Sequence, residues 1–429
     1  MNLMVIDSDG TGLDLCYRAS EAGHKVKWWM KKEKGKIPKD GDGFSGIEKV
    51  DNWRSHMQWA KQGLIVNLYN DKDIVPALDR YKDFGFPVFG PSAKSSELER
   101  NRGKGMKALE DKGIKVPPYK TFNTLEEAEK YALKEDRRLV FKCLGDEEDK
   151  SMSYCAHSPE DMGGRIRSWI ETGYKLKGPC MLQDFIEGIE IGVSGWMGKE
   201  GFLPKKWNIN FEYKKMMSGG YGPSTGEMGT LCHYVEASKL ADAVLAPMEG
   251  VLKGLGHLGD TDINCIVDKT GTPYPLEWTN RFGWPSTQIL MEAHEGDPIQ
   301  WMKDALTGKD SLKVSDDMSM GVLMAAPPFP WPDEDGIANG MTVTGVEDNW
   351  DFIAPWQLEL DGDEYKTTWT YVLLVRTLAH EPHDIIPKMY EIVDRIKFPD
   401  RIVRDDIGRD LEEKLPILHS YGYDEMLDW

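Results

Sequence analysis

The first ninety residues alternate short apolar runs with amphipathic stretches, and this alternation restricts the possible folds more than any other feature of the chain. The runs typical of strands are residues 3–6, 25–29, 64–68 and 87–89, and helical patterns cover residues 13–22 and 73–81. Apolar strands separated by helices predict a parallel, doubly wound sheet.

The loop after the first predicted strand is a candidate binding site, because ligands of such sheets lie at the carboxyl ends of the strands. Gly10 and Gly12 lie in this loop, where backbone N–H groups can hold an anion. Asp7 and Asp9 lie beside them and would repel an anion. The two glycines therefore indicate a substrate-binding loop but not a dinucleotide fingerprint.

The rest of the chain combines strands and helices in a different pattern. A charged helix is predicted over 96–113, followed by a break at the prolines of 115–118. Beyond it, the predicted strands are 138–143, 180–186 and 368–375, and the predicted helices are 125–133, 158–172, 237–255 and 384–396. A proline-rich segment at 325–335 marks a second boundary.

These breaks predict an α/β and α+β chain with a doubly wound N-terminal domain and a small C-terminal α+β domain. The expected units are an N-terminal substrate domain (1–92), a connecting helix and linker (93–118), a small subdomain (119–190), a large subdomain (191–325) and a C-terminal domain (326–429).

Composition excludes some classes of function. The net charge of −19 disfavours binding to nucleic-acid backbones or to anionic lipid. There is no apolar run of ~18 residues and no basic stretch leading into an apolar signal segment. The six cysteines lack metal-binding spacing and favour a reduced, cytoplasmic protein.

A polar hairpin is the best candidate for a metal site. Strands 262–268 and 273–276 flank a turn at 269–272. Asp262 and Asn264 share one face of the first strand. The hairpin can bring them together with Glu277 and Asn280 around a hard cation such as Mg²⁺, with Arg281 beside it. A solvated polar hairpin is the alternative.

Three further segments carry candidate binding residues. Lys142 ends a strand, and Lys150 follows the acidic turn 146–149, so the two lysines could clamp a polyphosphate or could be surface residues. The strand ending at 186 enters a connector whose backbone could pair with an adenine ring. The glycine-rich segment 218–229, preceded by Lys214 and Lys215, permits close approach of a ligand or serves as a linker.

The order of these features resembles that of the ATP-grasp ligases, and within them the phosphoribosylamine–glycine ligase family. The matching segments are Val-Phe-Gly-Pro-Ser-Ala at 88–93, Phe-Lys at 141–142, Gln-Asp-Phe-Ile-Glu-Gly-Ile-Glu at 183–190, Gly-Pro-Ser-Thr-Gly-Glu-Met-Gly at 222–229, Leu-Glu at 276–277 with Arg-Phe-Gly at 281–283, Tyr-Val-Leu-Leu-Val at 371–375 and Asp-Asp-Ile-Gly at 405–408.

The resemblance implies an ATP-grasp fold that binds ATP between two α+β subdomains with Mg²⁺, for which Mn²⁺ could substitute. It places the nucleotide on Arg102, Lys104, Lys142, Gln183, Asp184, Phe185, Ile186 and Glu190. It places the metal on Glu277 and on a partner among Asn264, Thr279 and Asn280. It gives catalytic roles to Lys142, Lys150 and Arg281. The implied substrate contacts are Gly10, Gly12, Lys214, Lys215, Ser224, Thr225, Gly226 and Arg281.

The implied reaction joins a carboxylate to an amine through an acyl phosphate, as in purine biosynthesis, in a monomer or homodimer acting on small molecules. Three segments depart from the family: the acidic lid at 146–149, the loop at 7–15, and Gly219-Gly220. The segments expected to bind the amine acceptor therefore depart from the family pattern more than the segments expected to bind ATP. Two alternatives stay open: the same chemistry on a different amine, and a non-catalytic nucleotide-binding relative.

Overall fold

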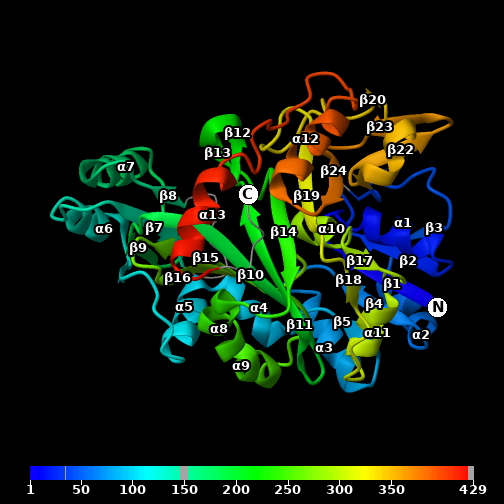
Figure 1. Ribbon diagram of the computed structural model, residues 1–429, viewed down its shortest axis with the longest axis horizontal. Helices are drawn as coiled ribbons and strands as arrows, with labels where there is room; N and C mark the ends of the chain where they lie inside the picture. Colours follow the sequence, from blue (N-terminus) through cyan, green and yellow to red (C-terminus); the bar gives the residue numbers. More distant parts are fainter. Residues whose placement is uncertain (34, 145–152, 424–429) are drawn as a thin grey trace.

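The structure is a computed structural model that describes residues 1–33, 35–144 and 153–423. Its N-terminal part is a five-stranded sheet of order β3-β2-β1-β4-β5, in which all pairs are parallel (Figure 1). The strands are β1 (Asn2–Asp7), β2 (Lys25–Met30), β3 (Ile47–Val50), β4 (Leu64–Asn67) and β5 (Val88–Phe89). The predicted parallel sheet is therefore confirmed.

Helices cover both faces of this sheet because successive strand residues point to opposite sides. Leu3 and Val5 of β1 belong to the same core cluster as α1 (Leu13–Glu21). Met4 and Ile6 belong to a second cluster with α2 (Met57–Ala60) and α3 (Val75–Asp83). The edge strand β3 was not predicted, since Glu48 and Lys49 leave it only two apolar residues.

The connecting segment differs from the single helix predicted over 96–113. It forms two helices, α4 (Ala93–Arg100) and α5 (Arg102–Glu110). The chain breaks at Asn101, whose side chain accepts a hydrogen bond from the Lys104 N–H and caps α5.

Residues 119–144 and 153–184 form a separate small layer with its own hydrophobic core. Its antiparallel sheet has the order β6-β9-β7-β8 and lies at the opposite end of the molecule from the N-terminal sheet (Figure 1). The elements are β6 (Tyr119–Phe122), α6 (Leu125–Ala132), β7 (Leu139–Cys143), β8 (Tyr154–Cys155), α7 (Pro159–Glu171) and β9 (Cys180–Asp184).

An eight-stranded antiparallel sheet occupies the centre of the molecule (Figure 1), with the order β16-β15-β10-β11-β14-β19-β24-β21. The strands are β10 (Gly188–Gly198), β11 (Gly201–Glu212), β14 (Gly229–Val235), β15 (Gly259–Asp268), β16 (Pro273–Thr279), β19 (Met318–Ala325), β21 (Ile353–Pro355) and β24 (Tyr371–Ala379). Because β24 pairs with β19, the sheet crosses the boundary predicted at residue 325. The division into domains stays a prediction.

Shorter elements surround the central sheet. They are the pairs β12 (Lys215–Met217) with β13 (Tyr221–Ser224) and β17 (His294–Glu295) with β18 (Lys313–Val314), the three-stranded sheet of β20 (Thr342–Val343), β23 (Glu364–Thr367) and β22 (Leu358–Asp361), and the helices α8 (Lys239–Val244), α9 (Glu249–Gly254), α10 (Ser286–Leu290), α11 (Gln300–Ala305), α12 (Pro382–Val393) and α13 (Leu411–Ser420). The helix predicted over 237–255 is wrong as one element. A short 3₁₀ turn containing Pro247 separates α8 from α9.

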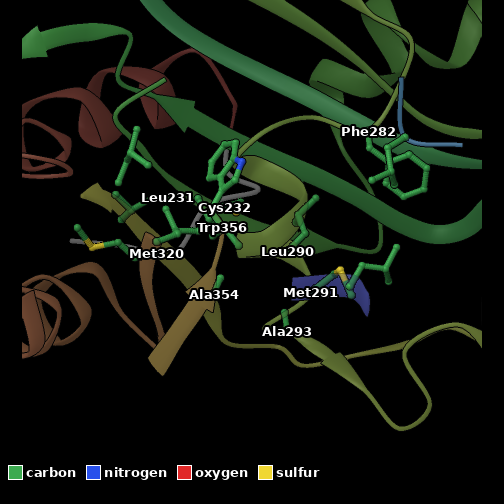
Figure 2. Close-up of a cluster of buried hydrophobic side chains, with 14 of the residues drawn as sticks. Leu231, Cys232, Phe282, Leu290, Met291, Ala293, Met320, Ala354 and Trp356 are labelled. Carbon is green, nitrogen blue, oxygen red and sulfur yellow. The ribbon is translucent and has the colours of Figure 1, made fainter. Parts of the chain in front are cut away.

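The main core lies where the central sheet meets α10 and the C-terminal strands. Side chains from β14, β19 and α10 pack together there with Trp356, as Figure 2 shows for Leu231, Met320 and Leu290. No helix in the described part of the chain is both long and apolar enough to cross a bilayer.

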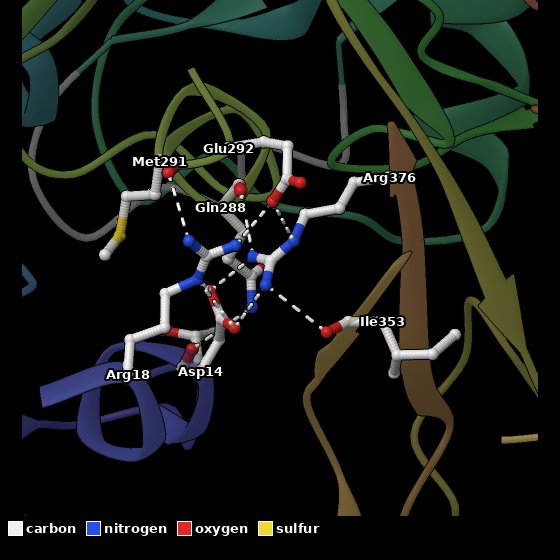
Figure 3. Close-up of polar contacts among 8 residues, drawn as sticks. Asp14, Arg18, Gln288, Met291, Glu292, Ile353 and Arg376 are labelled. Carbon is white, nitrogen blue, oxygen red and sulfur yellow. Dashed lines mark hydrogen bonds and ion pairs between the residues drawn. The ribbon is translucent and has the colours of Figure 1, made fainter. Parts of the chain in front are cut away.

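A buried ionic network joins the N-terminal sheet to the central sheet (Figure 3). Arg376 of β24 donates to both carboxylate oxygens of Asp14 on α1, at 2.6 and 2.9 Å. Its Nε lies 2.9 Å from Glu292, which also pairs with Arg18 at 2.5 Å. Arg376 also donates to the carbonyl oxygens of Gln288 and Ile353. Four segments distant in sequence are therefore held by one guanidinium.

Removing that guanidinium leaves the buried Asp14 carboxylate with only the longer, 3.4 Å contact to Arg18. We expect Arg376→Leu to lower the free energy of unfolding by about 3–5 kcal/mol in urea titrations. Lys107→Ala is the control, because Lys107 forms an exposed pair with Asp111 on α5, and it should change stability by less than about 0.5 kcal/mol. Equal effects of the two substitutions would contradict a stabilising role for the network.

Candidate functional site

The β15–β16 hairpin has the turn that was predicted. Asp262 pairs with Thr279 and Asn264 pairs with Glu277. The turn closes through hydrogen bonds between Asp268 and Thr272 and between Gly271 and Asp268. Because side chains alternate across a strand, Asp262, Asn264, Glu277 and Thr279 share one face. Strand β16 extends three residues beyond its predicted end, which brings Glu277 and Thr279 into the sheet.

Lys214 lies at the centre of the charges on this face. Its Nζ is 3.0 Å from Glu277, 3.1 Å from Glu212 and 3.3 Å from Glu190. Arg102, at the start of α5, reaches Glu277 at 3.8 Å. Side chains from α5, β10, β11 and β16 therefore meet around one lysine.

These contacts change the acid–base properties of the cluster. Lys214, followed by Arg102 and Lys142, holds the pKa of Glu277 well below its usual range despite burial. Burial lowers the pKa of Lys214, but Glu277, Glu212 and Glu190 together raise it well above its usual value. Glu277 and Lys214 are therefore both charged at neutral pH.

Lys142 connects the two antiparallel sheets. It lies on β7 of the small sheet, is 9% exposed, and donates a 3.1 Å hydrogen bond to the Leu276 carbonyl on β16. Burial lowers its pKa to about 8, although Glu277 acts in the opposite direction. A buried lysine with one carbonyl partner still has donors for an anionic ligand.

Asn280 is wrong as a metal ligand. It follows β16 on the opposite face from Glu277, because adjacent strand residues alternate. Its side-chain oxygen accepts from Thr261, its nitrogen donates to the Ser95 carbonyl at 3.3 Å, and its backbone N–H donates to Glu99 at 2.8 Å. The residue fixes the hairpin to α4, which leaves Asn264 and Thr279 as partners for Glu277.

Several buried polar atoms at this junction have no partner among the described residues. They are Arg102 Nη1, Gln183 Nε2 and Asn264 Oδ1. Two are donors suited to phosphate or base oxygens, and one is an acceptor suited to a cation. Asn264 also donates to Glu212 at 2.7 Å, which directs its oxygen outward from that pair. The residues present therefore fit a nucleotide with a divalent metal ion.

The described residues contain no group of three or more His, Cys, Asp or Glu side chains able to hold a metal by themselves. A site of one carboxylate and one amide matches the way Mg²⁺ binds with substrate phosphates.

The predicted adenine connector follows β9. Asp184 donates its backbone N–H to Pro118 and pairs with Arg137 at 3.0 Å, and Phe185 packs under Arg138, whose guanidinium lies 3.6 Å from the ring centroid. Ile186 is half-buried, and Glu190 extends from β10 to Lys214. The connector is thus anchored on both sides and ends beside the charge cluster.

Other predicted residues lie away from the cluster. Lys104 is exposed and pairs with Glu97 at 2.6 Å, and the Lys215 side chain is exposed on β12. Ser224 is exposed on β13, whereas Thr225 donates to the Lys214 carbonyl at 2.8 Å. Lys150 and the acidic turn 146–149 lie outside the described residues.

The loop after β1 does not offer its N–H groups to a ligand, contrary to the expectation for Gly10 and Gly12. Asp7 accepts from the backbone N–H groups of Asp9 (3.1 Å), Gly10 (2.9 Å) and Gly12 (2.7 Å), and from the Trp28 indole at 3.1 Å. A Cβ on Gly12 would lie 3.0 Å from the Asp7 carboxylate. The chain's own carboxylate occupies the place of an external anion.

A cavity of about 540 Å³ lies beside this loop. Its aromatic lining consists of Tyr69, Trp284, Trp356, Trp369 and Tyr371, and its charged lining consists of Asp9, Lys31, Lys32, Glu33, Asp40, Glu227 and Arg281. We call this cavity the acceptor pocket. Arg281 lies here rather than beside the metal candidates, and it pairs with Glu99 at 3.4 Å.

A second cavity of about 410 Å³ adjoins the acceptor pocket and shares Glu33, Asp40, Gln357 and Trp369 with it. Sequence patterns did not indicate the aromatic residues, because they come from segments brought together only by folding. The high tryptophan count was the one available signal, and it equally fits core packing. Glu227 lies in the glycine-rich segment 218–229 but was not singled out as a site residue.

No protein-family model matches the chain. The phosphoribosylamine–glycine ligase of Escherichia coli O157:H7 is 26% identical over 351 residues, which cover 77% of this chain and 79% of that protein. The enzyme of the same name from Halalkalibacterium halodurans is 23% identical over 428 residues, which cover 95% of this chain and 96% of that protein.

Among solved structures, phosphoribosylamine–glycine ligase from Thermotoga maritima matches with a TM-score of 0.72 at 19% identity, covering 95% of this chain and 100% of that one. The chain has the ATP-grasp fold. L-amino acid ligase from Bacillus licheniformis is a more distant match, with a TM-score of 0.58, 15% identity and coverage of 92% and 98%.

The ATP-grasp fold explains why the charge cluster lies where it does. The fold places a small antiparallel sheet over a large one, and in this chain the hydrogen bond from Lys142 to Leu276 joins the two. Gln183, Glu190 and Glu277 approach the same junction from three strands.

A charged lysine that is buried in order to bind a ligand should lower the free energy of unfolding of the ligand-free protein. Since the pKa of Lys142 falls from 10.5 to about 8 on folding, the unfolded state binds more protons between these pH values, and stability rises with pH through that window. We expect Lys142→Met to raise the free energy of unfolding at pH 7 by up to about 3 kcal/mol. The difference should shrink towards pH 10 in denaturant titrations, and a difference independent of pH would contradict the burial cost.

Proposed function

We propose that the protein is an ATP-dependent carboxylate–amine ligase similar to phosphoribosylamine–glycine ligase. The observation that carries this proposal is the cluster of Glu277, Lys214, Lys142 and Arg102 at the junction of the two ATP-grasp sheets. The relatives' names supply the reaction class, and the cluster supplies the groups that such a reaction needs.

The charged residues have separate tasks in this proposal. Lys142 and Arg102 carry unused donors and would hold phosphate oxygens of ATP. Glu277, with Asn264 or Thr279, would hold Mg²⁺, and Mn²⁺ would fit the same oxygen ligands. The metal ion would neutralise part of the negative charge on the phosphates. Lys214 keeps Glu277 ionised and thus ready to bind a cation.

The reaction proceeds in two displacements. An oxygen of the amino acid's carboxylate forms a bond to the γ-phosphorus, and the bond to the ADP oxygen breaks. The nitrogen of the amine then forms a bond to the acyl carbon, the bond from that carbon to the phosphate oxygen breaks, and inorganic phosphate leaves. Catalysis of this kind rests on positioning and charge stabilisation rather than on a protein nucleophile.

A second candidate keeps this chemistry but uses an acceptor other than phosphoribosylamine. The observation in its favour is the loop after β1, where Asp7 occupies the backbone N–H groups that could otherwise bind a phosphate. Lys214 is not free to replace them, because three carboxylates surround it. We favour this candidate for the acceptor and leave the amino acid unassigned.

The remaining features of the proposal are the cellular compartment and the oligomeric state. All six cysteines are free thiols, which suits a reducing cytoplasm. We propose a monomer or homodimer that acts on small molecules.

The first displacement can be tested without knowing the acceptor. Hydroxylamine traps an acyl phosphate as a hydroxamate, so ATP, Mg²⁺ and a set of amino acids should yield hydroxamate and ADP together. Glu277→Gln should lower this rate by about 10²-fold or more, a loss typical of removing one electrostatic contact from a reacting site.

Glu236→Gln is the matched control, because Glu236 is 74% exposed and pairs with Lys205 outside the cluster. It should keep the wild-type rate. Absence of hydroxamate with every amino acid, or an undiminished rate in Glu277→Gln, would refute the proposed function.

A further inference from the structure

Glu227 is a buried carboxylate on the wall of the acceptor pocket. It is 4% exposed, lines the cavity, and its Oε1 has no hydrogen-bond partner among the described residues. Neighbouring buried acids do have partners: Asp262 accepts from Asn210 at 2.8 Å, and Glu212 pairs with Lys214 at 3.1 Å. Asp260 also has an oxygen, Oδ1, without a partner among the described residues, but Asp260 does not line this cavity, whereas Glu227 does.

A buried, charged carboxylate is energetically unfavourable unless a cation pairs with it or it takes up a proton. A bound ligand can supply that cation. Burial and then Glu212 raise the pKa of Glu227 well above its usual value, while Lys214 and Arg281 act against the rise. Such a group can hold a proton that it takes from a ligand. The charged groups that face it are Glu212, Lys214, Asp262 and Arg281.

The position of Glu227 relates the pocket to the charge cluster. Thr225 donates its N–H to the Lys214 carbonyl at 2.8 Å, and Met228 donates to the Tyr213 carbonyl at 2.8 Å. The backbone on either side of Glu227 is thus fixed to the segment that carries Lys214, whose Nζ contacts Glu277 at 3.0 Å. Glu227 therefore lies between the candidate nucleotide site and the acceptor pocket.

Aromatic rings form a continuous wall of the same pocket. The ring centroids of Tyr69 and Trp284 are 6.3 Å apart and nearly parallel, those of Trp284 and Trp356 are 6.3 Å apart, and those of Trp356 and Tyr371 are 5.0 Å apart. The Trp284 indole nitrogen is buried and has no hydrogen-bond partner in the part of the chain that the structure describes. A wall of this kind favours a planar ring over a phosphorylated sugar.

We propose that the acceptor is a primary amine attached to a planar ring, that the ring lies on the Tyr69–Trp284–Trp356–Tyr371 wall, and that Glu227 binds the ammonium group and takes its proton. This rests on the proposed ligase function. Glu227 takes one proton from the ammonium ion, and the nitrogen lone pair forms the bond to the acyl carbon. The bond from that carbon to the phosphate oxygen breaks, and the second nitrogen proton leaves with the phosphate.

Comparing two nucleophiles shows whether Glu227 acts as a base or only supports the structure. Hydroxylamine is neutral near pH 7 and needs no base before attack, whereas benzylamine is a cation and does. In Glu227→Gln, we expect the ratio of amide formation from benzylamine to hydroxamate formation to fall by about 10²-fold, the usual contribution of a general base. Glu227→Asp should recover part of the loss, and the remaining benzylamine rate of Glu227→Gln should rise with pH.

A matched pair of amines tests the aromatic wall. Benzylamine should be used with a kcat/KM about fivefold above that of cyclohexylmethylamine, as expected for one favourable ring contact. Trp284→Leu should remove this preference. Quenching of tryptophan fluorescence by benzylamine without ATP gives an independent measure of binding.

Three outcomes would overturn the inference, provided that the wild-type protein forms hydroxamate. They are equal kcat/KM values for benzylamine and cyclohexylmethylamine, an unchanged amide-to-hydroxamate ratio in Glu227→Gln, and efficient turnover of phosphoribosylamine but not of ring-bearing amines. Failure of hydroxamate formation itself would instead refute the proposed function, so the two failures are distinguishable.

Discussion

The buried pairing of Arg376 with Asp14 and Glu292 is the constraint on which the arrangement of the binding sites depends. Arg376 lies on the central sheet and Asp14 on the first helix of the N-terminal sheet. Their contact brings the loop after β1 to the same cavity as Trp356 and Tyr371, and all of them line the acceptor pocket. Because each carboxylate is costly to bury alone, the network favours one relative placement of the two sheets.

A second lysine-centred network organises the nucleotide side. Lys214 contacts three carboxylates on three strands, and its charge keeps Glu277 ionised. The positive charge of Lys142 is less well stabilised by neighbouring carboxylates, and burial lowers its pKa to about 8. The site thus keeps one anion ready for a metal ion and one cation ready for phosphate, which is the charge pattern a nucleotide requires.

The two sides of the site differ in how much of them could be predicted. The spacing of Asp262 and Asn264 indicated that they share a face, and Glu277 and Lys142 were separate candidates; the structure brings Asn264, Glu277 and Lys142 to one junction. Asn280 was misplaced, because β16 continues to Thr279 and the next residue faces the side opposite to Glu277. On the acceptor side, the two glycines suggested an anion site, but only the structure shows that Asp7 occupies it.

Local patterns in the sequence were enough to predict the parallel N-terminal sheet and the polar hairpin, and short motifs indicated the ATP-grasp class, because both depend on neighbours within about ten residues. The hydrogen-bond partners of the buried acids, in contrast, are known only from the folded chain. No described residue donates a hydrogen bond to Glu227 Oε1, and Trp284 meets Trp356 only after β21 and β24 join the central sheet. Burial and partner identity are properties of contacts between distant segments, and local sequence patterns do not encode them.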